Sequence, residues 1–304
     1  MSIAVFGSIN MDLVVRTPQL PAAGETVLGH DFYTAPGGKG ANQAVACARL
    51  EQTTRMVGRV GNDVFAGALL DSLRENNVDV TLVLTDAERP SGVALISVDD
   101  TSENTIVVVP GANRSIGDGD ISRLEDALKG AQVLLLQLEI PIDMVVMAAK
   151  AASERGIKVI LDPAPAQSLP SELYKNCTVI TPNEIEAGLL VGTPPVRDQN
   201  DARRAASVLI ERGAEQVIIK MGGKGAYWSD GAEDVFFPAY SVDPVDTVAA
   251  GDAFNGGLAV GLADGLPLHD AINYGMAAGA LSTTQHGAQP SMPDRDSVEN
   301  LLVG

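Results

Sequence analysis

Residues 133–161 read VLLLQLEIPIDMVVMAAKAASERGIKVIL, a pattern typical of a strand, a helix and a second strand. Val133–Leu138 is an apolar run of the kind found in strands that are buried on both faces of a sheet. The helix opened by Pro141 is predicted to extend to about Arg155, and Lys158–Leu161 is predicted to be the next strand. A strand–helix–strand unit of this kind indicates a parallel sheet that is covered by helices.

The same alternation of short apolar runs and helical patterns continues through much of the chain. We predict further strands at Ile3–Gly7, Val57–Gly61, Thr178–Thr181 and Val217–Met221. We predict further helices at Ala41–Leu50, Val64–Asn76, Glu184–Leu190 and Asp201–Arg212. This order indicates a mostly parallel sheet with helices on both faces. A length of 304 residues suits one large domain with an insertion as well as it suits two domains.

Two stretches interrupt the alternation. Residues from about 12 to 36 carry prolines and glycines without a helical period. Residues from about 91 to 110 contain two β-rich runs, Val93–Val98 and Thr105–Val109, separated by a polar turn. We expect these stretches to pair into a small sheet outside the main one, which would form a lid over the α/β domain. The alternative is an antiparallel edge of the main sheet.

The composition argues against several classes of function. The formal net charge is −18, so the surface repels nucleic acids and anionic membranes, and neither is expected as a partner. Cys47 and Cys177 lie among apolar or small neighbours, and we expect buried free thiols in a reducing compartment. The first residues show no signal-peptide pattern, and no stretch approaches the ~18 apolar residues of a membrane span. We therefore expect a cytoplasmic protein.

Several common catalytic motifs are absent from the sequence. It contains no GxxxxGK[ST] phosphate-binding loop and no GxSxG nucleophile motif. Its three histidines, His30, His269 and His286, show no spacing typical of metal ligands. These observations argue against a zinc site and against a Ser-His-Asp triad.

The strongest candidate for chemistry is VDTVAAGDAFNGG at residues 245–257. Ala249, Ala250 and Gly251 are small enough for backbone N–H groups to approach a ligand, and the apolar spacing after them predicts a helix that starts near Gly251. Such a helix start forms an anion hole suited to a phosphoryl group in transfer. Asp252 would then be the general base that accepts a proton from a hydroxyl nucleophile. The alternative is a carboxylate that only complements the helix dipole.

Two further motifs suit a small ligand that is rich in hydroxyl groups. In PGGKGANQA the glycines allow the backbone to approach a small polar ligand, and Lys39 and Asn42 supply donors. In GSINMD, directly after the first predicted strand, Asn10 and Asp12 share one face of an extended chain. An amide and a carboxylate on one face can bind a polyol. The alternatives are an ordinary glycine turn before a helix and turn chemistry at a strand end.

Polar residues also follow three of the predicted strands. Glu139 ends the run VLLLQLE, and Asn183 and Glu186 follow the strand VIT. Ligands bind at this carboxyl edge of an open α/β sheet, and a carboxylate such as Glu186 can hold Mg²⁺ through water. Lys220–Gly225 ends another strand with a glycine turn, against which a nucleotide would lie. The alternative for this last segment is a plain hairpin.

Together these motifs resemble those of the PfkB carbohydrate kinase family over essentially the whole chain. The motifs are GSINMD (7–12), GETVLG (24–29), PGGKGANQAVA (36–46), QLE (137–139), TPNEIE (181–186) and DTVAAGDAFNG (246–256). The resemblance implies a ribokinase-like α/β three-layer sandwich, formed by a single domain over residues 1–304, with a mostly parallel central sheet. It also implies a small β-sheet lid that serves as the clasp of a homodimer.

The resemblance assigns roles to individual residues. The catalytic residues would be the base Asp252 and the anion hole of Ala249, Ala250 and Gly251. The sugar-binding residues would be Asn10, Asp12, Gly38, Lys39, Gly40, Asn42, Glu139 and Asp252. The nucleotide-binding residues would be Asn183, Glu186, Lys220, Met221, Gly222, Gly223, Gly225, Gly251 and Met276, with Mg²⁺ held by Glu186 through water. An activating potassium ion would be held by Asp246, Val248, Ser282, Gln285, Gly287 and Ser291, largely through backbone carbonyls. At Met276, Ser282 and Gln285 the chain departs from the residues usual in the family.

The activity that the resemblance implies is phosphorylation of D-ribose at O5 by ATP, giving D-ribose 5-phosphate and ADP by direct in-line transfer. Relatives that act on deoxyribose tend to lack the amide equivalent to Asn10, so its presence favours a sugar with a 2-hydroxyl group. The alternative within the family is a kinase for 2-deoxyribose, another pentose or a nucleoside. A non-catalytic sugar sensor is the alternative outside the enzymes, although the base, the anion hole and the Mg²⁺ motif are intact.

Overall fold

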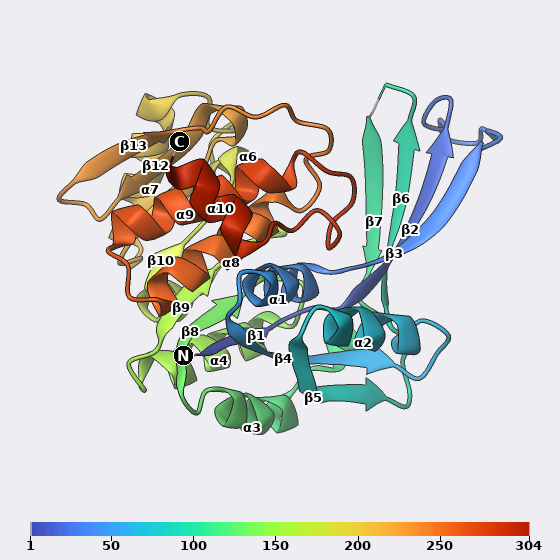
Figure 1. Ribbon diagram of the computed structural model, residues 1–304, viewed down its shortest axis with the longest axis horizontal. Helices are drawn as coiled ribbons and strands as arrows, with labels where there is room; N and C mark the ends of the chain where they lie inside the picture. The colour runs from blue at the N-terminus through green and yellow to red at the C-terminus, as the bar shows by residue number, and fades with distance from the viewer. Residues whose placement is uncertain (1, 102, 304) are drawn as a thin grey trace.

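The computed structural model describes residues 2–101 and 103–303, whose strands form two sheets (Figure 1). The strands of the larger sheet are β1 (Ser2–Phe6), β4 (Thr53–Gly61), β5 (Val78–Asp86), β8 (Ala131–Leu136), β9 (Lys158–Leu161), β10 (Val179–Ile180), β11 (Val217–Lys220), β12 (Gly225–Ser229) and β13 (Asp234–Pro238). Among the described residues their order is β13-β12-β11-β10-β9-β8-β1-β4-β5. All neighbours from β5 to β11 pair in parallel, and β12 and β13 add an antiparallel edge.

Helices cover both faces of this sheet and divide the core in two. One face carries α1 (Lys39–Arg49), α2 (Ala66–Glu75), α8 (Ala250–Ala263), α9 (Leu268–Ser282) and α10 (Arg295–Val303). The other face carries α3 (Asp118–Ala127), α4 (Ile142–Ser153), α5 (Ser171–Lys175), α6 (Glu184–Val191) and α7 (Gln199–Glu211). In β8, Val133 and Leu135 join the first core while Leu134 and Leu136 join the second, because successive side chains of a strand point to opposite faces. The predicted three-layer α/β sandwich is therefore confirmed.

The predicted elements are confirmed with shifts of a few residues at their ends. The strand Lys158–Leu161 has the predicted bounds, whereas the preceding strand begins earlier than predicted and ends at Leu136. Helix α7 begins two residues before its predicted start, because the Asp198 side chain accepts hydrogen bonds from the N–H groups of Asn200 and Asp201. A side-chain cap of this kind sets the first residue of a helix, whereas the apolar period defines only its middle.

The smaller sheet consists of the two stretches that interrupt the sequence pattern. Its strands are β2 (Asn10–Thr17), β3 (Asp31–Gly37), β6 (Gly92–Asp99) and β7 (Asn104–Val109), in the order β3-β2-β6-β7. The β2–β6 pair is parallel, and the two outer pairs are antiparallel. The sheet projects from the three-layer body, at the upper right of Figure 1. The alternative that these stretches form an edge of the main sheet is wrong.

A short connection and a close contact between helices set the geometry of the region where the sheets meet. Only three residues, Gly7 to Ile9, separate the end of β1 from the start of β2. Helices α1 and α8 approach each other so closely that a Cβ on Gly256 would lie 2.5 Å from the Ala46 Cβ. At the start of α1, the Ala41 N donates to the Ser8 O just beyond β1, and Gln43 donates to Asp252 in the first turn of α8, so the two helix starts lie together beyond the carboxyl end of β1.

Candidate active site

The start of α8 forms the centre of the candidate active site. Its N-cap, Ala249, adopts the left-handed conformation with φ of 59° and ψ of 12°. This conformation costs a residue with a Cβ about 1–2 kcal/mol, and such strain often marks functional backbone. Ala250 and Gly251 begin the helix, so the N–H groups of this first turn lack partners within the helix and carry the positive end of its dipole. The helix start lies where the sequence predicts it, and its role as an anion hole stays a prediction.

Asp252 lies in the first turn of α8 and is buried. Its Oδ2 accepts a hydrogen bond from Asn42 Nδ2 at 3.0 Å, and its Oδ1 accepts one from Gln43 Nε2 at 3.0 Å. Burial, together with the negative charge of Asp162, raises the pKa of Asp252, although the Lys39 ammonium and these two amides act in the opposite direction. A carboxylate with a raised pKa is a stronger base than an ordinary aspartate, which suits the acceptance of a proton.

The glycines of PGGKGANQA make a contact that differs from the predicted one. A Cβ on Gly38, whose φ is 89°, would lie 2.7 Å from the Asn10 N, and a Cβ on Gly40 would lie 2.7 Å from the Ser8 N. These glycines let α1 start directly against the loop that follows β1, where the Ala41 N donates to the Ser8 O at 2.9 Å. Their immediate effect is to bring two motifs of the chain together.

The predicted sugar-binding residues Asn10 and Glu139 belong to one hydrogen-bonded group. Glu139 Oε2 accepts hydrogen bonds from Ser8 Oγ at 2.5 Å and from the Lys39 backbone N at 3.2 Å. The same oxygen accepts one from Asn10 Nδ2 at 3.4 Å. Three motifs that are far apart in the sequence therefore converge, and Glu139 lies beyond the carboxyl end of its strand as predicted.

Asp12 and Lys39 complete this group with opposite charges. Asp12 lies over Gly37, where a Cβ would overlap its carboxylate. Burial, followed by the negative charges of Glu139 and Asp252, raises the pKa of Asp12 to about 7. Burial lowers the pKa of Lys39, but Asp252 and neighbouring carboxylates raise it by more, and the net direction is upward. One ammonium group is thus surrounded by carboxylates that compete for it.

Two residues that sequence reasoning missed connect the predicted groups. Asp162 is buried directly after β9, where its Oδ1 pairs with Lys220 Nζ at 2.9 Å and its Oδ2 accepts from Gln43 Nε2 at 3.1 Å. Gln43 therefore donates to both Asp162 and Asp252. A Cβ on Gly251 would lie 3.3 Å from Lys220 Nζ, so this ammonium is next to the start of α8. The strand-end rule that predicted Glu139 also applies to Asp162, whereas Gln43 gives no signal within its helix.

Asn183 and Glu186 form a capping box at the start of α6. Asn183 Oδ1 accepts from the N–H groups of Ile185 at 2.9 Å and Glu186 at 2.8 Å, and Glu186 Oε2 accepts from the Asn183 N at 2.8 Å. This structural role of the motif was not predicted. Burial raises the pKa of Glu186, although nearby Lys220 lowers it. The cap uses one of the two carboxylate oxygens and leaves the other available, so Glu186 fits the predicted contact with Mg²⁺ through water, which stays a prediction.

The predicted nucleotide loop, Lys220–Gly225, is a tight connection from β11 to β12 through the 3₁₀ helix η2 (Gly222–Lys224). Gly222 and Gly223 are exposed, and a Cβ on either would meet no atom within 4 Å. The loop therefore offers open backbone to a ligand. Met276, predicted near the adenine, is only 8% exposed and packs in the core between the helices and the sheet. Its contact with a nucleotide stays a prediction.

The predicted potassium ligands lie on two loops that hydrogen bonds join. The Thr283 O accepts from the Val245 N at 2.7 Å and the Asp246 N at 3.0 Å. Asp246 Oδ2 accepts from the Gly287 N at 2.9 Å. The other predicted ligands on or beside these loops are Val248, Ser282, Gln285 and Ser291. A carboxylate and backbone carbonyls are oxygen donors of the kind that K⁺ prefers, so the residues fit the ion.

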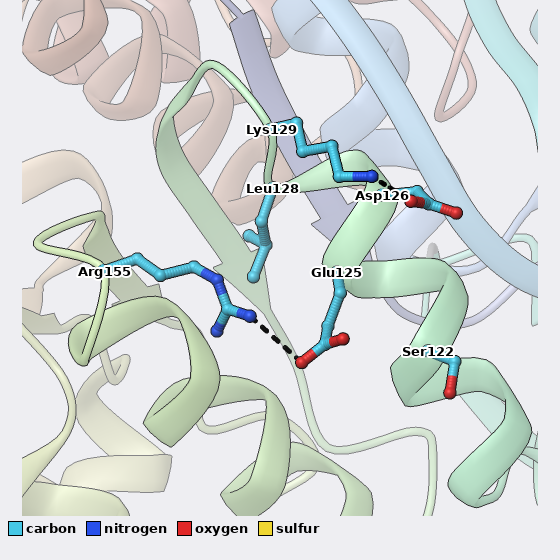
Figure 2. Close-up of a pocket in the computed structure, with 6 residues that line it drawn as sticks. All are labelled: Ser122, Glu125, Asp126, Leu128, Lys129 and Arg155. Carbon is cyan, nitrogen blue, oxygen red and sulfur yellow. Dashed lines mark hydrogen bonds and ion pairs between the residues drawn. The ribbon is translucent and has the colours of Figure 1, made fainter.

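The opposite edge of the main sheet carries a hollow of about 220 Å³ that is unrelated to this cluster (Figure 2). Leu128 and Lys129 precede β8, and Arg155 precedes β9, so the hollow lies at the amino ends of the strands. Arg155 and Glu125 face each other across it at 3.0 Å, and Lys129 pairs with Asp126. The charged side chains that line the hollow are therefore paired with one another.

Both cysteines are buried and free, as predicted, and burial raises the pKa of each thiol. Within residues 2–101 and 103–303, no group of three or more His, Cys, Asp or Glu side chains is arranged to hold a metal ion. In the same part of the chain no helix has the length and apolar character that crossing a bilayer requires.

A model of the pfkB family carbohydrate kinases matches residues 1–295. The chain belongs to this family. Among curated pfkB-like relatives, the ribokinase of Haemophilus influenzae is 39% identical over 99% of this chain and 98% of its own length. The deoxyribokinase of Salmonella typhi is 37% identical over 99% of both chains. The solved structure of Arabidopsis thaliana ribokinase complexed with ribose and ATP is 33% identical, with a TM-score of 0.89 over 99% of this chain and 98% of that one.

Membership of the pfkB family confirms the resemblance that the sequence motifs carry. The ribokinase-like fold, with its large mostly parallel sheet and separate small sheet, is confirmed as well. The pfkB kinases are phosphotransferases, so the chain is a kinase. The residue roles inside the site are not settled by membership and stay predictions.

The raised pKa of Asp12 predicts a pH dependence of stability in the ligand-free protein. Between the ordinary value of 3.8 and about 7, the folded chain holds a proton that the unfolded chain has released. Rising pH through this window therefore lowers the free energy of unfolding. In Asp12→Asn this contribution is absent, so its free energy of unfolding should fall less between pH 5 and pH 8. Urea unfolding across this range measures the difference, and parallel curves for the two proteins would contradict the assignment.

Proposed function

We propose that this pfkB-family kinase transfers a phosphoryl group from ATP to O5 of D-ribose, giving D-ribose 5-phosphate and ADP. The observation that carries the proposal is the buried Asp252 at the start of α8, beside the hydrogen-bonded group of Asn10 and Glu139. A base, a helix N-terminus and a polyol-binding face thus occupy one region of the molecule. The ribokinase names of the relatives and the ribose and ATP of the Arabidopsis thaliana complex support the choice of substrates.

In the proposed mechanism, Asp252 accepts the proton of the attacking hydroxyl group. Asn42 and Gln43 hold its carboxylate in place, which restricts the base to one orientation. The N–H groups at the start of α8 and the nearby Lys220 ammonium stabilise the negative charge on the phosphoryl group in transfer. Phosphate passes directly from ATP to the sugar, without a phosphoenzyme. Closure of the small sheet over ribose would exclude water as a competing acceptor.

We propose two metal ions as further cofactors. Mg²⁺, held through water by the free oxygen of Glu186, would neutralise charge on the nucleotide phosphates. K⁺ would bind the Asp246 carboxylate and the carbonyls of the two joined loops, and would keep these loops ordered beside the start of α8. The two cations would supply positive charge beside the carboxylate cluster, and ATP would supply the phosphoryl group. A cytoplasmic location stays a prediction from the sequence.

The main alternative is a kinase of the same family with another acceptor. The Salmonella typhi deoxyribokinase is nearly as similar as the ribokinases, so overall identity does not separate the two sugars. Asn10 favours ribose, because a buried amide that faces the sugar gains a partner from a 2-hydroxyl group. A non-catalytic sensor is disfavoured by the intact base and its hydrogen-bonded carboxylate.

The substrate is tested by coupled ADP release with Mg-ATP and a panel of D-ribose, 2-deoxy-D-ribose, fructose and adenosine. We expect turnover that is selective for ribose and that K⁺ stimulates. Preference for another acceptor would refute ribose while retaining the kinase mechanism. No turnover with any acceptor would support the sensor.

Replacement of the base gives a second test in the same assay. Asp252→Asn keeps the size of the side chain, but it removes the proton acceptor and replaces one of the two accepting oxygens with an NH2 group, so kcat should fall about 10²–10⁴-fold. Ribose affinity, measured by calorimetry, should change little. Asp270→Asn is a matched control, because Asp270 also lies in the first turn of a helix, α9, and is exposed. Near-normal turnover of Asp252→Asn would refute the assignment of the base.

We propose that the small sheet also forms the interface of a homodimer. Its strands expose the apolar side chains of Phe32, Tyr33, Leu95, Ile106, Val107, Val108 and Val109. The register of the strands places Phe32, Leu95, Val107 and Val109 on one face of the sheet, and monomeric proteins rarely leave such an apolar surface uncovered. A second copy of the same sheet would bury it by pairing face to face.

Sedimentation velocity tests the dimer. Val107 is 59% exposed on β7, and Val107→Lys should weaken association at least about tenfold by placing a charge in the interface. Val303→Lys, at an exposed position of α10, is the matched control. A wild-type protein that sediments as a monomer at micromolar concentration would exclude the proposal.

A further inference from the structure

The side chain of Asn113 makes three hydrogen bonds that no role assigned so far explains. It lies in the 3₁₀ helix η1 (Gly111–Ser115), which follows β7 as the chain returns from the small sheet, and it is completely buried. Asn113 Oδ1 accepts from the Ile9 N at 3.0 Å, and its Nδ2 donates to the Ile9 O at 3.2 Å. The same Nδ2 donates to Asn10 Oδ1 at 2.7 Å.

These contacts determine the orientation of two side-chain amides. A backbone N–H only donates and a backbone C=O only accepts, so Ile9 fixes which end of the Asn113 amide is oxygen and which is nitrogen. The nitrogen of Asn113 therefore faces Asn10, which must turn its own oxygen towards it. The Nδ2 of Asn10 consequently points the other way, where it donates to Glu139 Oε2 at 3.4 Å. One N–H of Asn10 is used by this long contact, and the second remains for a ligand.

Gly92 provides independent evidence that this pair of amides is a built feature. It pairs with Asn10 in the β2–β6 ladder. A Cβ on Gly92 would overlap both Asn10 Oδ1 and Asn113 Nδ2. The absence of a side chain at this position of β6 is therefore what allows the two amides to meet.

We propose that Asn113 is a positioning residue that, with the space left at Gly92, makes Asn10 present an N–H donor to the sugar and thereby favours a sugar with a 2-hydroxyl group. The inference rests on the proposed phosphorylation of ribose. A hydroxyl oxygen accepts the free N–H of Asn10. A 2-deoxy sugar leaves this buried donor unpaired, and an unpaired buried donor costs about 1–3 kcal/mol.

The test compares kcat/KM for D-ribose and 2-deoxy-D-ribose at saturating Mg-ATP. Asn113→Ser removes the amide that holds Asn10, and Gly92→Ala displaces the pair while keeping every group of Asn113. Both variants should reduce the ribose-to-deoxyribose ratio about tenfold or more. The loss should fall on the KM for ribose, with the KM for ATP and the kcat unchanged.

Matched controls and a double mutant separate this role from general destabilisation. Asn76→Ser at the C-cap of α2 and Gly67→Ala within α2 make the same changes far from the site. A Cβ on Gly67 meets no atom within 4 Å, and both variants should keep the wild-type ratio. In an Asn10→Ala background, Asn113→Ser should change the ratio no further, because Asn113 acts through Asn10. If Asn113→Ser does not fold, the ribose-to-deoxyribose ratios of Gly92→Ala and its control Gly67→Ala test the proposal instead.

Each outcome has a distinct meaning. A wild-type enzyme with no preference between the two sugars would refute the proposed substrate. A wild-type preference for ribose that both variants retain would overturn the role of Asn113. An equal loss of activity towards both sugars in folded variants would also overturn it, because a merely structural effect does not distinguish the sugars.

Discussion

The close contact between α1 and α8 sets the position of the predicted catalytic groups. Gly256 has no side chain to separate the helices, and a Cβ there would lie 2.5 Å from the Ala46 Cβ. Only at this distance can Asn42 and Gln43 of α1 reach both oxygens of Asp252. Because α1 also starts against the loop that follows β1, one helix positions the predicted base, the predicted sugar face and the small sheet.

Charge imposes the second constraint. Five carboxylates surround two ammonium groups in the site: Asp12, Glu139, Asp162, Glu186 and Asp252 against Lys39 and Lys220. In a chain with a net charge of −18, such a site would repel the phosphates of ATP. Partial protonation of Asp12 near neutral pH reduces this repulsion, and the dipole of α8 offsets a further part. The proposed cations would offset the rest of the repulsion between the carboxylates and the phosphates.

The small sheet is connected to the catalytic centre through a short segment. Ile9 follows β1 of the main sheet and precedes β2 of the small sheet, and Asn113 binds both its N–H and its C=O. Asn10, the first residue of β2, lies at the same junction. In the proposed mechanism, this short connection would link recognition of the sugar to closure of the small sheet.

Much of the architecture could be predicted from the sequence because it depends on local patterns. The apolar run that contains β8 and the helical period after it indicate a parallel sheet covered by helices, and Lys158–Leu161 has the predicted bounds. Elements whose sequence lacks a one-sided pattern were not predicted. Helix α9 is buried on most of its surface, so it shows no amphipathic stripe, and β13 is a short edge strand.

The candidate site also has features that the sequence predicts and features that only the structure shows. The sequence by itself determined which segments are candidates for the chemistry, since Asp252 and Glu139 follow from a helix start and a strand end. Only the tertiary structure decided how these groups are held. Gln43 bridges two carboxylates across a helix contact, Asn113 orients Asn10 from about a hundred residues away, and Gly92 matters for the space that it leaves. The physical reason is that a hydrogen bond or a steric overlap depends on the distance between two groups in space. The pattern of a single sequence shows the periodicity of each helix or strand, but it does not show which residues of different elements come into contact.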